Sequence, residues 1–136
     1  QYEPGDSTSS MFGGNSNWRG PIWFPINYLI IQALRKFYTY YGDAYTFEFP
    51  AKSGRKLTLK QIANELSKRL LKIFERSETG QFRYHPAQQK EWAAKHFREP
   101  HLFYEYFHGD SGQGLGASHQ TGWTALVANL LLEMEE

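Results

Sequence analysis

The sequence predicts an all-α domain whose helices are joined by long loops and short extended segments. Three segments repeat apolar residues at the three- and four-residue spacing of a buried helix face. Residues that commonly start or stop helices flank the first two of these segments. The connecting loops hold most of the tryptophan, histidine and glycine of the chain, and functional groups on a helical scaffold usually lie in such loops.

The first helix is expected to run from Pro25 to the residue before Gly42. Proline suits the first turn of a helix, where a missing N–H costs nothing. Glycine commonly follows the last turn, because it adopts the left-handed conformation found there. Between these two residues, apolar side chains recur at helical spacing at positions Ile26, Leu29, Ile30, Ala33, Leu34 and Phe37.

The second helix is expected to begin after Thr58. Thr58 and Gln61 have the spacing of a capping box, and Leu57 and Ile62 can form a hydrophobic staple across the first turn. Lysines at 60, 68 and 72 mark the solvent side. The predicted buried stripe consists of Leu59, Ile62, Leu66, Leu70, Ile73 and Phe74.

Two further helices and two extended segments complete the prediction. A weaker helical pattern covers residues 87–97, and a last helix runs from about residue 122 to residue 135. Residues 82–85 and 102–107 are expected to be extended. Strand alternation in the second segment would place Phe103, Glu105 and Phe107 on one face.

Composition narrows the classes of partner. A chain of 136 residues has room for one domain, and its net charge of +1 argues against nucleic acid as the main partner. No apolar run approaches the roughly 18 residues of a membrane-spanning helix, so we expect no membrane partner. Cysteine is absent, which excludes disulfides and thiol catalysis and favours a reducing compartment such as the cytoplasm. The chain begins at Gln1 in the middle of a motif, so targeting is not predicted.

Glu105 is the first candidate catalytic residue. It lies in the most aromatic window of the chain, between Phe103 and Tyr104 on one side and Tyr106 and Phe107 on the other. A half-buried carboxylate in such surroundings suits proton exchange. The alternative is a solvated strand glutamate between two core aromatic residues, and the spacing alone does not decide between them.

The second candidate is residues 17–24, NWRGPIWF. Trp18 and Trp23 offer flat apolar faces on which a sugar ring can stack. Arg19 offers a fork of donors for sugar hydroxyls or a carboxylate. The alternative is a structural corner with both tryptophans in the core and Arg19 beside a helix end, and the pattern by itself favours this alternative.

The third candidate is residues 108–123, a glycine-rich loop that we expect to line a pocket through Gln113 and His119. It matches neither phosphate-binding glycine motif, because no lysine follows the glycines. Ser118-His119 does not form a nucleophile elbow, since position 120 is glutamine rather than glycine. We therefore expect no cofactor. Metal binding is not expected either, because no helical histidine pair or cysteine supports His108, Asp110 and His119 as ligands.

Three strings together resemble the C-terminal half of the catalytic domain of glycoside hydrolase family 63. They are NSNWRGPIWFPINYLI (15–30), FYEYFHGDSGQGLG (103–116) and HQTGWTALVANLL (119–131). The family includes processing α-glucosidase I, which is a mannosyl-oligosaccharide glucosidase, mannosylglycerate hydrolases and longer bacterial glucosidase-like proteins. The similarity is greatest to the last group and covers nearly the whole chain.

The resemblance implies a fold and a set of site residues. Residues 1–136 would form part of an (α/α)6 toroid, the catalytic domain of an inverting enzyme that uses an Asp acid and a Glu base. The family's aromatic-Tyr-Glu motif reads Phe103-Tyr104-Glu105 here, which implies Glu105 as the base, with Tyr104 beside it as a substrate-binding residue. The segment that lines the sugar subsite in relatives corresponds to Trp18, Arg19 and Trp23, and the TGW element of the last helix corresponds to Thr121, Gly122 and Trp123, beneath the site.

The resemblance also implies that half of the catalytic pair lies elsewhere. The family's acid belongs to a motif upstream of the WRGP segment, and Asp6 stands too close to that segment and in a different context. We therefore expect a fragment of a glucosidase-like hydrolase acting on oligosaccharides or glycosylglycerates, inactive without the rest of its catalytic domain. Since a toroid needs about twelve helices, apolar faces should be exposed. The alternatives are a non-catalytic carbohydrate-binding module, using Trp18, Trp23 and Trp123, and a helical interaction domain without a ligand.

Overall fold

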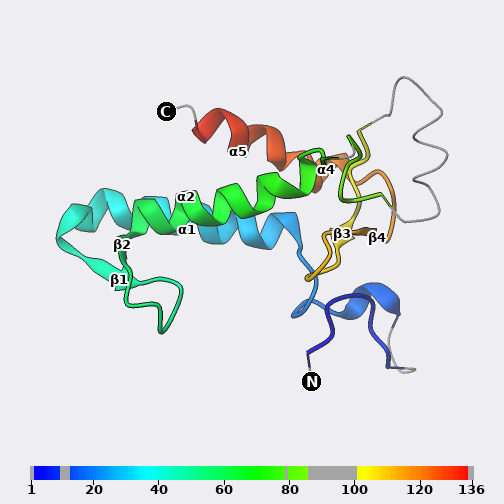
Figure 1. Cartoon of the computed structure of the whole chain (residues 1–136), viewed down its shortest axis with the longest axis horizontal. Coiled ribbons are helices and arrows are strands. Elements are labelled where there is room, and N and C mark those ends of the chain that lie inside the picture. The colour runs from blue at the N-terminus through cyan, green and yellow to red at the C-terminus, as the bar shows by residue number, and fades with distance from the viewer. Residues whose placement is uncertain (1, 10–12, 79, 86–100, 135–136) are drawn as a thin grey trace.

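The computed structural model describes residues 2–9, 13–78, 80–85 and 101–134. Three helices lie side by side (Figure 1), with α1 (Phe24–Tyr41) antiparallel to α2 (Leu59–Leu71) and α5 (Leu126–Met134) packed against both. The short helix α4 (Thr121–Thr124) precedes α5.

Two antiparallel hairpins complete the fold, β1 (Thr46–Glu48) with β2 (Lys56–Thr58), and β3 (Tyr106–Phe107) with β4 (Gly114–Leu115). Three 3-10 turns cover Gly14–Ser16, Gly42–Ala44 and Lys72–Phe74. The described chain is a small, mostly helical domain.

The ends of α1 agree with the sequence prediction, but many of its predicted apolar residues do not face the core. Pro25 lies in the first turn, and Gly42 caps the last turn with φ +60° and donates its N–H to the Tyr38 carbonyl. Phe24 and Ile31 are buried, with Tyr28 and Leu34 packed beside the core. The apolar residues that mark the helix most clearly in the sequence point mainly the other way, as described below.

Helix α2 begins as predicted, but it ends at Leu71, and Ile73 and Phe74 of the predicted stripe lie in the 3-10 turn that follows. The Thr58 N–H donates to Oε1 of Gln61 at 2.9 Å, and the Gln61 N–H donates to Oγ1 of Thr58 at 3.3 Å, which completes the capping box. Ile62, Leu70 and Ile73 are buried as predicted, and the three lysines are exposed. Burying a large aliphatic side chain contributes roughly 1.5–3 kcal/mol each, so this stripe holds α2 against α1 and α5.

Three sequence predictions need correction or lie outside the structure. The last helix is divided at Ala125, because Oγ1 of Thr124 donates to the Tyr104 carbonyl at 2.6 Å and anchors α4 to the strand segment, while α5 packs on α1 and α2. Residues 82–85 form no strand; only Phe82 joins an isolated β-bridge, and Phe82 and Tyr84 stack with ring centroids 5.0 Å apart as the chain turns into the core. The weaker helix predicted for 87–97 lies outside the described residues.

The segment 102–107 bends at Glu105 instead of continuing as a strand. Phe103 pairs with His119 in an isolated parallel bridge, and β3 begins only at Tyr106. Phe103 and Phe107 both pack on Phe74, whereas Glu105 turns away from that cluster toward Asn15 and Ala117. The prediction that Phe103, Glu105 and Phe107 share one face is therefore wrong, because the bend breaks the alternation.

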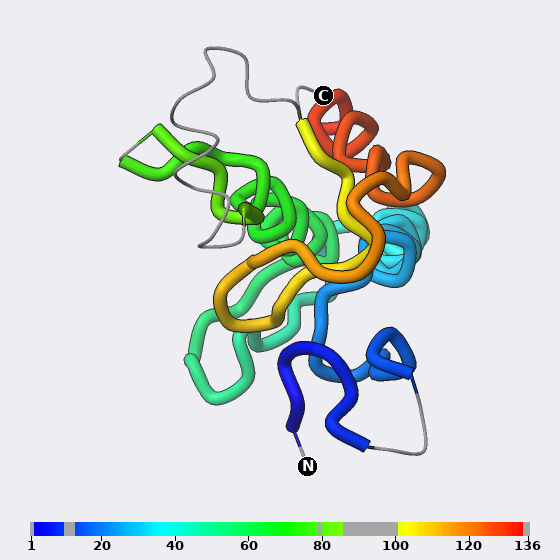
Figure 2. The backbone as a smooth tube through the Cα atoms, turned by 90° about the vertical axis from the view of Figure 1, so that its right-hand side faces the viewer, coloured from blue at the N-terminus to red at the C-terminus, as the bar shows by residue number. Residues whose placement is uncertain are grey.

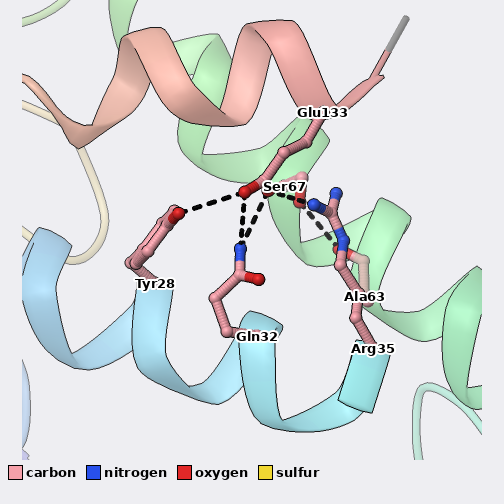
Figure 3. Close-up of polar contacts among 6 residues, drawn as sticks. All are labelled: Tyr28, Gln32, Arg35, Ala63, Ser67 and Glu133. Carbon is pink, nitrogen blue, oxygen red and sulfur yellow. Dashed lines mark hydrogen bonds and ion pairs between the residues drawn. The ribbon is translucent and has the colours of Figure 1, made fainter. Parts of the chain in front are cut away.

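A polar cluster joins α5 to α1 (Figure 3). Glu133 of α5 accepts hydrogen bonds from the Tyr28 hydroxyl at 3.0 Å and from the Gln32 amide at 2.8 and 2.9 Å, and it pairs with Arg35. Its donors stand at residues 28, 32 and 35, one or two turns apart, so they share one face of α1. These half-buried contacts fix how α5 crosses α1.

The outer side of α1 carries an exposed apolar stripe. Leu29 is 64% exposed and Tyr40 is 82% exposed, although both follow the spacing of a buried helix face. We define the α1 stripe as Ile26, Leu29, Ile30, Phe37, Tyr40 and Tyr41, which are all exposed. Monomers rarely leave such continuous apolar patches uncovered. The fold buries one face of α1 and leaves a second apolar face open.

We therefore expect the isolated chain to associate as its concentration rises. Light scattering after size exclusion should give a mass that increases with concentration, and Leu29→Glu combined with Phe37→Lys should return it toward the monomer, because these changes put charge on the α1 stripe. The exposed Lys68→Glu variant is the matched control and should not change the mass. A wild-type chain that stays monomeric throughout would contradict this prediction.

The N-terminal segment and the β3–β4 hairpin lie at the same end of the helices (Figure 1), and Figure 2 shows the molecule from that end. Ile22 and Phe107 exchange backbone hydrogen bonds of 2.8 and 2.9 Å. The Gly109 N–H donates to the Pro4 carbonyl at 2.7 Å, and the Tyr2 hydroxyl donates to Asp110 at 2.9 Å. Two segments that lie a hundred residues apart in the sequence thus form one surface.

Candidate active site

A column of three stacked aromatic rings forms the centre of this surface. Trp18 stacks on Trp23 with ring centroids 3.8 Å apart and planes within 7°, and Trp23 stacks on Tyr106 at 4.4 Å and 16°. Trp123 of α4 meets Trp18 and Trp23 edge-on, at 6.4 and 6.0 Å. Such stacked and edge-on pairs each contribute roughly 0.5–1.5 kcal/mol beyond their buried area. The column therefore holds the WRGPIW segment rigidly against the hairpin and the last helices.

Among the described residues, the column is accessible to solvent at its Trp18 end. Trp23 is 2% exposed because Trp18 and Tyr106 cover its two faces, and its Nε1 donates to the Asn17 carbonyl at 3.1 Å. Trp18 ends the column and is 49% exposed. A sugar ring stacking on this column would therefore meet Trp18, with Trp23 as the support behind it.

Glu105 stands next to the inner end of the column, one residue before Tyr106. Its carboxylate is half-buried and accepts two hydrogen bonds, one on each oxygen. The side-chain amide of Asn15 donates to Oε1 at 3.2 Å, and the Ala117 N–H donates to Oε2 at 3.1 Å. The Glu105 N–H donates in turn to the Ala117 carbonyl at 2.8 Å. Both carboxylate oxygens are therefore held by a donor, and each keeps an acceptor site that a water molecule can use.

Tyr106 links the column to a second carboxylate. Its hydroxyl donates a hydrogen bond to Oδ1 of Asp6. Burial raises the pKa of Tyr106 far above its ordinary value, and the hydrogen bond to Asp6 and the charges of Asp6 and Glu105 raise it further. The hydroxyl therefore remains protonated and acts only as a donor toward Asp6. This bond fixes the loop that carries Asp6 beside the residue that follows Glu105.

A polar pocket opens beside Trp18. Its volume is about 350 Å³, at the lower end of the range usual for small-molecule sites. Trp18 supplies an apolar wall and Arg19 a cation. The other lining residues in the described part of the chain are polar: Glu3, Ser7, Ser9, Ser16 and Asn17. An aromatic wall among many hydroxyl, amide and carboxylate groups suits a ligand that is itself rich in hydroxyls.

A family model for the mannosylglycerate hydrolase MGH1-like glycoside hydrolase domain matches residues 5–124, nearly the whole chain. The chain belongs to this glycoside hydrolase family. The match confirms the relationship to glycoside hydrolase family 63 that the three strings indicate. It includes the column, Glu105 and the hairpin in one domain match.

Three curated relatives resemble this glycoside hydrolase domain. An uncharacterized protein of Saccharomyces cerevisiae is 48% identical over 136 residues, covering 98% of the chain and 12% of that protein. The mannosyl-oligosaccharide glucosidase of the same yeast is 33% identical over 121 residues, covering 88% of the chain and 11% of that protein. A probable mannosyl-oligosaccharide glucosidase of Schizosaccharomyces pombe is 26% identical over 121 residues, again with 88% and 11% covered. The chain thus spans only about a tenth of the length of these relatives.

The hydrolase domain brings some of the predicted site residues together and separates others. Trp18, Trp23 and Trp123 come together in and beside the column. Glu105 lies at the Tyr106 end of the column, near Gly116, whereas the described lining of the pocket includes Trp18 and Arg19 but not Glu105. The Tyr104 ring is buried in the core, which raises its pKa, and lies against Gly114. Gln113 lies beside the turn of the β3–β4 hairpin, where its carbonyl accepts from the His108 N–H at 2.8 Å. His119 is exposed and pairs with Phe103 through the backbone.

Sequence reasoning missed Asn15, Asp6 as a partner of Tyr106, and the backbone of Ala117. The Gly-Asn-Ser-Asp composition of residues 1–20 indicates a functional loop, but nothing in it singles out Asn15. The contact with Glu105 spans 90 residues of sequence, so only the fold reveals it.

The described parts of the hydrolase domain contain no group of three or more His, Cys, Asp and Glu side chains placed to hold a metal ion. His108 instead accepts hydrogen bonds on Nδ1 from the N–H groups of Asp110 and Ser111, both at 3.3 Å, in the hairpin turn. Among the described helices, none is both long enough and apolar enough to cross a bilayer.

Proposed function

We propose that the chain is part of an inverting glycoside hydrolase that cleaves α-glucosidic or related α-glycosidic bonds, with Glu105 as the general base. The observation that carries the proposal is the half-buried carboxylate with a hydrogen-bond donor on each oxygen, next to Tyr106 in an aromatic column whose outer ring, Trp18, is half exposed. The family supports hydrolysis, and two relatives are named as mannosyl-oligosaccharide glucosidases. The substrate we propose is accordingly a glucose-terminated oligosaccharide or a glycosylglycerate.

The chemistry requires a second carboxyl group. In inverting hydrolysis a base takes a proton from water as the water oxygen bonds to the anomeric carbon, and an acid protonates the leaving oxygen as the glycosidic bond breaks. The two carboxyl groups stand about 6.5–9.5 Å apart, with the sugar and the water between them. The family's acid belongs to a motif upstream of the WRGP segment, and Asp6 stands too close to that segment to match it, so we assign the acid to an aspartate elsewhere in a longer protein.

The fold proposed for that longer protein is an (α/α)6 toroid. Helices α1, α2 and α5 would be part of its ring, and the α1 stripe would pack against helices that this chain lacks. The exposed apolar face of α1 supports this assignment. The remainder of the catalytic domain is then the partner that completes both the core and the acid–base pair.

We expect the isolated chain to hydrolyse a glucose-terminated oligosaccharide at least about 10²-fold more slowly than the longer protein, because general-acid help alone contributes about 10²–10⁴-fold. Release of glucose measured enzymatically provides the rate, and NMR of the product of the longer protein should show the inverted, β anomer. Turnover by the isolated chain at the rate of the longer protein would show that no external acid is needed.

A carbohydrate-binding module is the second candidate, favoured by the exposed indole of Trp18 beside the polar pocket. The two candidate functions differ in the expected effect of Glu105→Gln, which removes the charge of this side chain. A base is needed for turnover and not for affinity, whereas a binding module has no turnover to lose. Titration of the longer protein with the oligosaccharide, followed by tryptophan fluorescence, measures the affinity in both cases.

A further inference from the structure

The Glu105 carboxylate is held from two independent directions. On one side, the backbone of Ala117 makes two hydrogen bonds with Glu105. Its carbonyl accepts from the Glu105 N–H at 2.8 Å, and its N–H donates to Oε2 at 3.1 Å. These two hydrogen bonds depend on glycine at position 116. Its φ of +68° is strained for other residues, and a Cβ there would lie 2.5 Å from Oε2 of Glu105. On the other side, the Asn15 amide donates to Oε1 at 3.2 Å.

Asn15 is presented by a loop that is itself fastened. It belongs to the 3-10 turn Gly14–Ser16, which is closed by a 3.0 Å hydrogen bond from the Ser16 N–H to the Gly13 carbonyl. The Ser7 N–H donates to the Gly14 carbonyl at 2.8 Å, and Asp6 in the same loop accepts from Tyr106. The loop that carries Asn15 is therefore hydrogen-bonded to Tyr106, the residue that follows Glu105.

We propose that Asn15 is a positioning residue for the general base, an inference that rests on the function proposed for Glu105. An ionised carboxylate has about four acceptor sites, and Asn15 and Ala117 occupy one on each oxygen. Because a donor holds each oxygen, the carboxylate does not rotate about the Cγ–Cδ bond. Its remaining acceptor sites therefore point in a fixed direction. The attacking water donates to one of those sites and passes its proton there as its oxygen bonds to the anomeric carbon.

Asn15→Ala in the longer protein tests this role. A hydrogen bond to a charged group contributes enough to change an equilibrium by about 10- to 100-fold, so kcat should fall by that factor while KM stays unchanged. Asn15→Asp should lower kcat further, because it places a second negative charge against Oε1. A rise in KM with unchanged kcat would overturn the inference, because Asn15 would then bind substrate instead of orienting the base.

Tyr2→Phe is the matched control. It removes one hydrogen bond between the same N-terminal segment and the same hairpin, the 2.9 Å bond to Asp110, without touching Glu105. We expect its kcat to equal that of the wild type. An equal loss in Tyr2→Phe and Asn15→Ala would assign the effect to loosening of the loop and overturn the positioning role.

A double-mutant cycle separates this inference from the proposed function. If Asn15 acts through Glu105, Asn15→Ala should cause no further loss in a Glu105→Ala background, where formate added at high concentration should restore both variants equally. A full additional loss in that background overturns the inference alone. Wild-type turnover in Glu105→Ala would instead overturn the proposed function, whatever Asn15→Ala does.

Discussion

Replacing Glu105 by glutamine is expected to lower the kcat of the longer protein by about 10²–10⁴-fold, the usual contribution of a general base. Glutamine keeps the length and shape of the side chain, and its carbonyl oxygen can still accept from Asn15 or from Ala117. It carries no charge and does not take a proton from water near neutral pH. The loss should therefore fall on the chemical step, with KM and the oligosaccharide affinity measured by tryptophan fluorescence unchanged.

The matched control for this substitution is Glu75→Gln. Glu75 is exposed at the end of the turn Lys72–Phe74 and carries the same charge change outside the column and the hairpin. We expect its kcat and KM to match those of the wild type. A Glu105→Gln enzyme that turns over as fast as Glu75→Gln would remove Glu105 from the mechanism and leave carbohydrate binding as the better-supported function.

Gly20→Ala is expected to have the largest effect on stability. A Cβ at residue 20 would lie 2.5 Å from the carbonyl carbon of Glu3, closer still to its oxygen, and 3.1 Å from Cα of Pro4. These are backbone atoms, so no side-chain rotation relieves the overlap. Pro4 also accepts the hydrogen bond from Gly109, so displacing it opens the contact between the N-terminal segment and the hairpin.

We expect Gly20→Ala to lower the free energy of unfolding by about 1–3 kcal/mol, the usual cost of inserting a group into a packed region. Urea denaturation followed by tryptophan fluorescence measures it, because Trp18 and Trp23 lie in the adjoining column. We also expect Gly20→Ala to lower kcat as Asn15→Ala does, because displacement of the N-terminal loop moves Asn15 away from Glu105.

Gly122→Ala is the control for Gly20→Ala. Gly122 lies in α4, and a Cβ there would have no atom within 4 Å. Because alanine loses less conformational freedom than glycine in a helix, we expect this change to be neutral or to stabilise by up to about 1 kcal/mol. If the two variants were equally stable, the close approach of Glu3 to Gly20 would not hold in solution.

Local signals determined the ends and the character of two helices. Pro25, Gly42 and the Thr58–Gln61 capping box act through residues within one turn of themselves, so the sequence alone predicts them and the structure agrees. The three family strings likewise identify the glycoside hydrolase relationship, because each is a contiguous run of residues. The Glu105 hypothesis follows from one of these runs.

Tertiary structure decided the rest, because periodicity reveals an apolar face but not the neighbour that covers it. In α1 the face with the clearest pattern points outward, while Phe24 and Ile31 face the core. The bend at Glu105 depends on Ala117, twelve residues later, and its second donor depends on Asn15, ninety residues earlier. Hydrogen bonds and ring stacking over such separations form only when the chain is folded, and they set the direction in which the carboxylate can act.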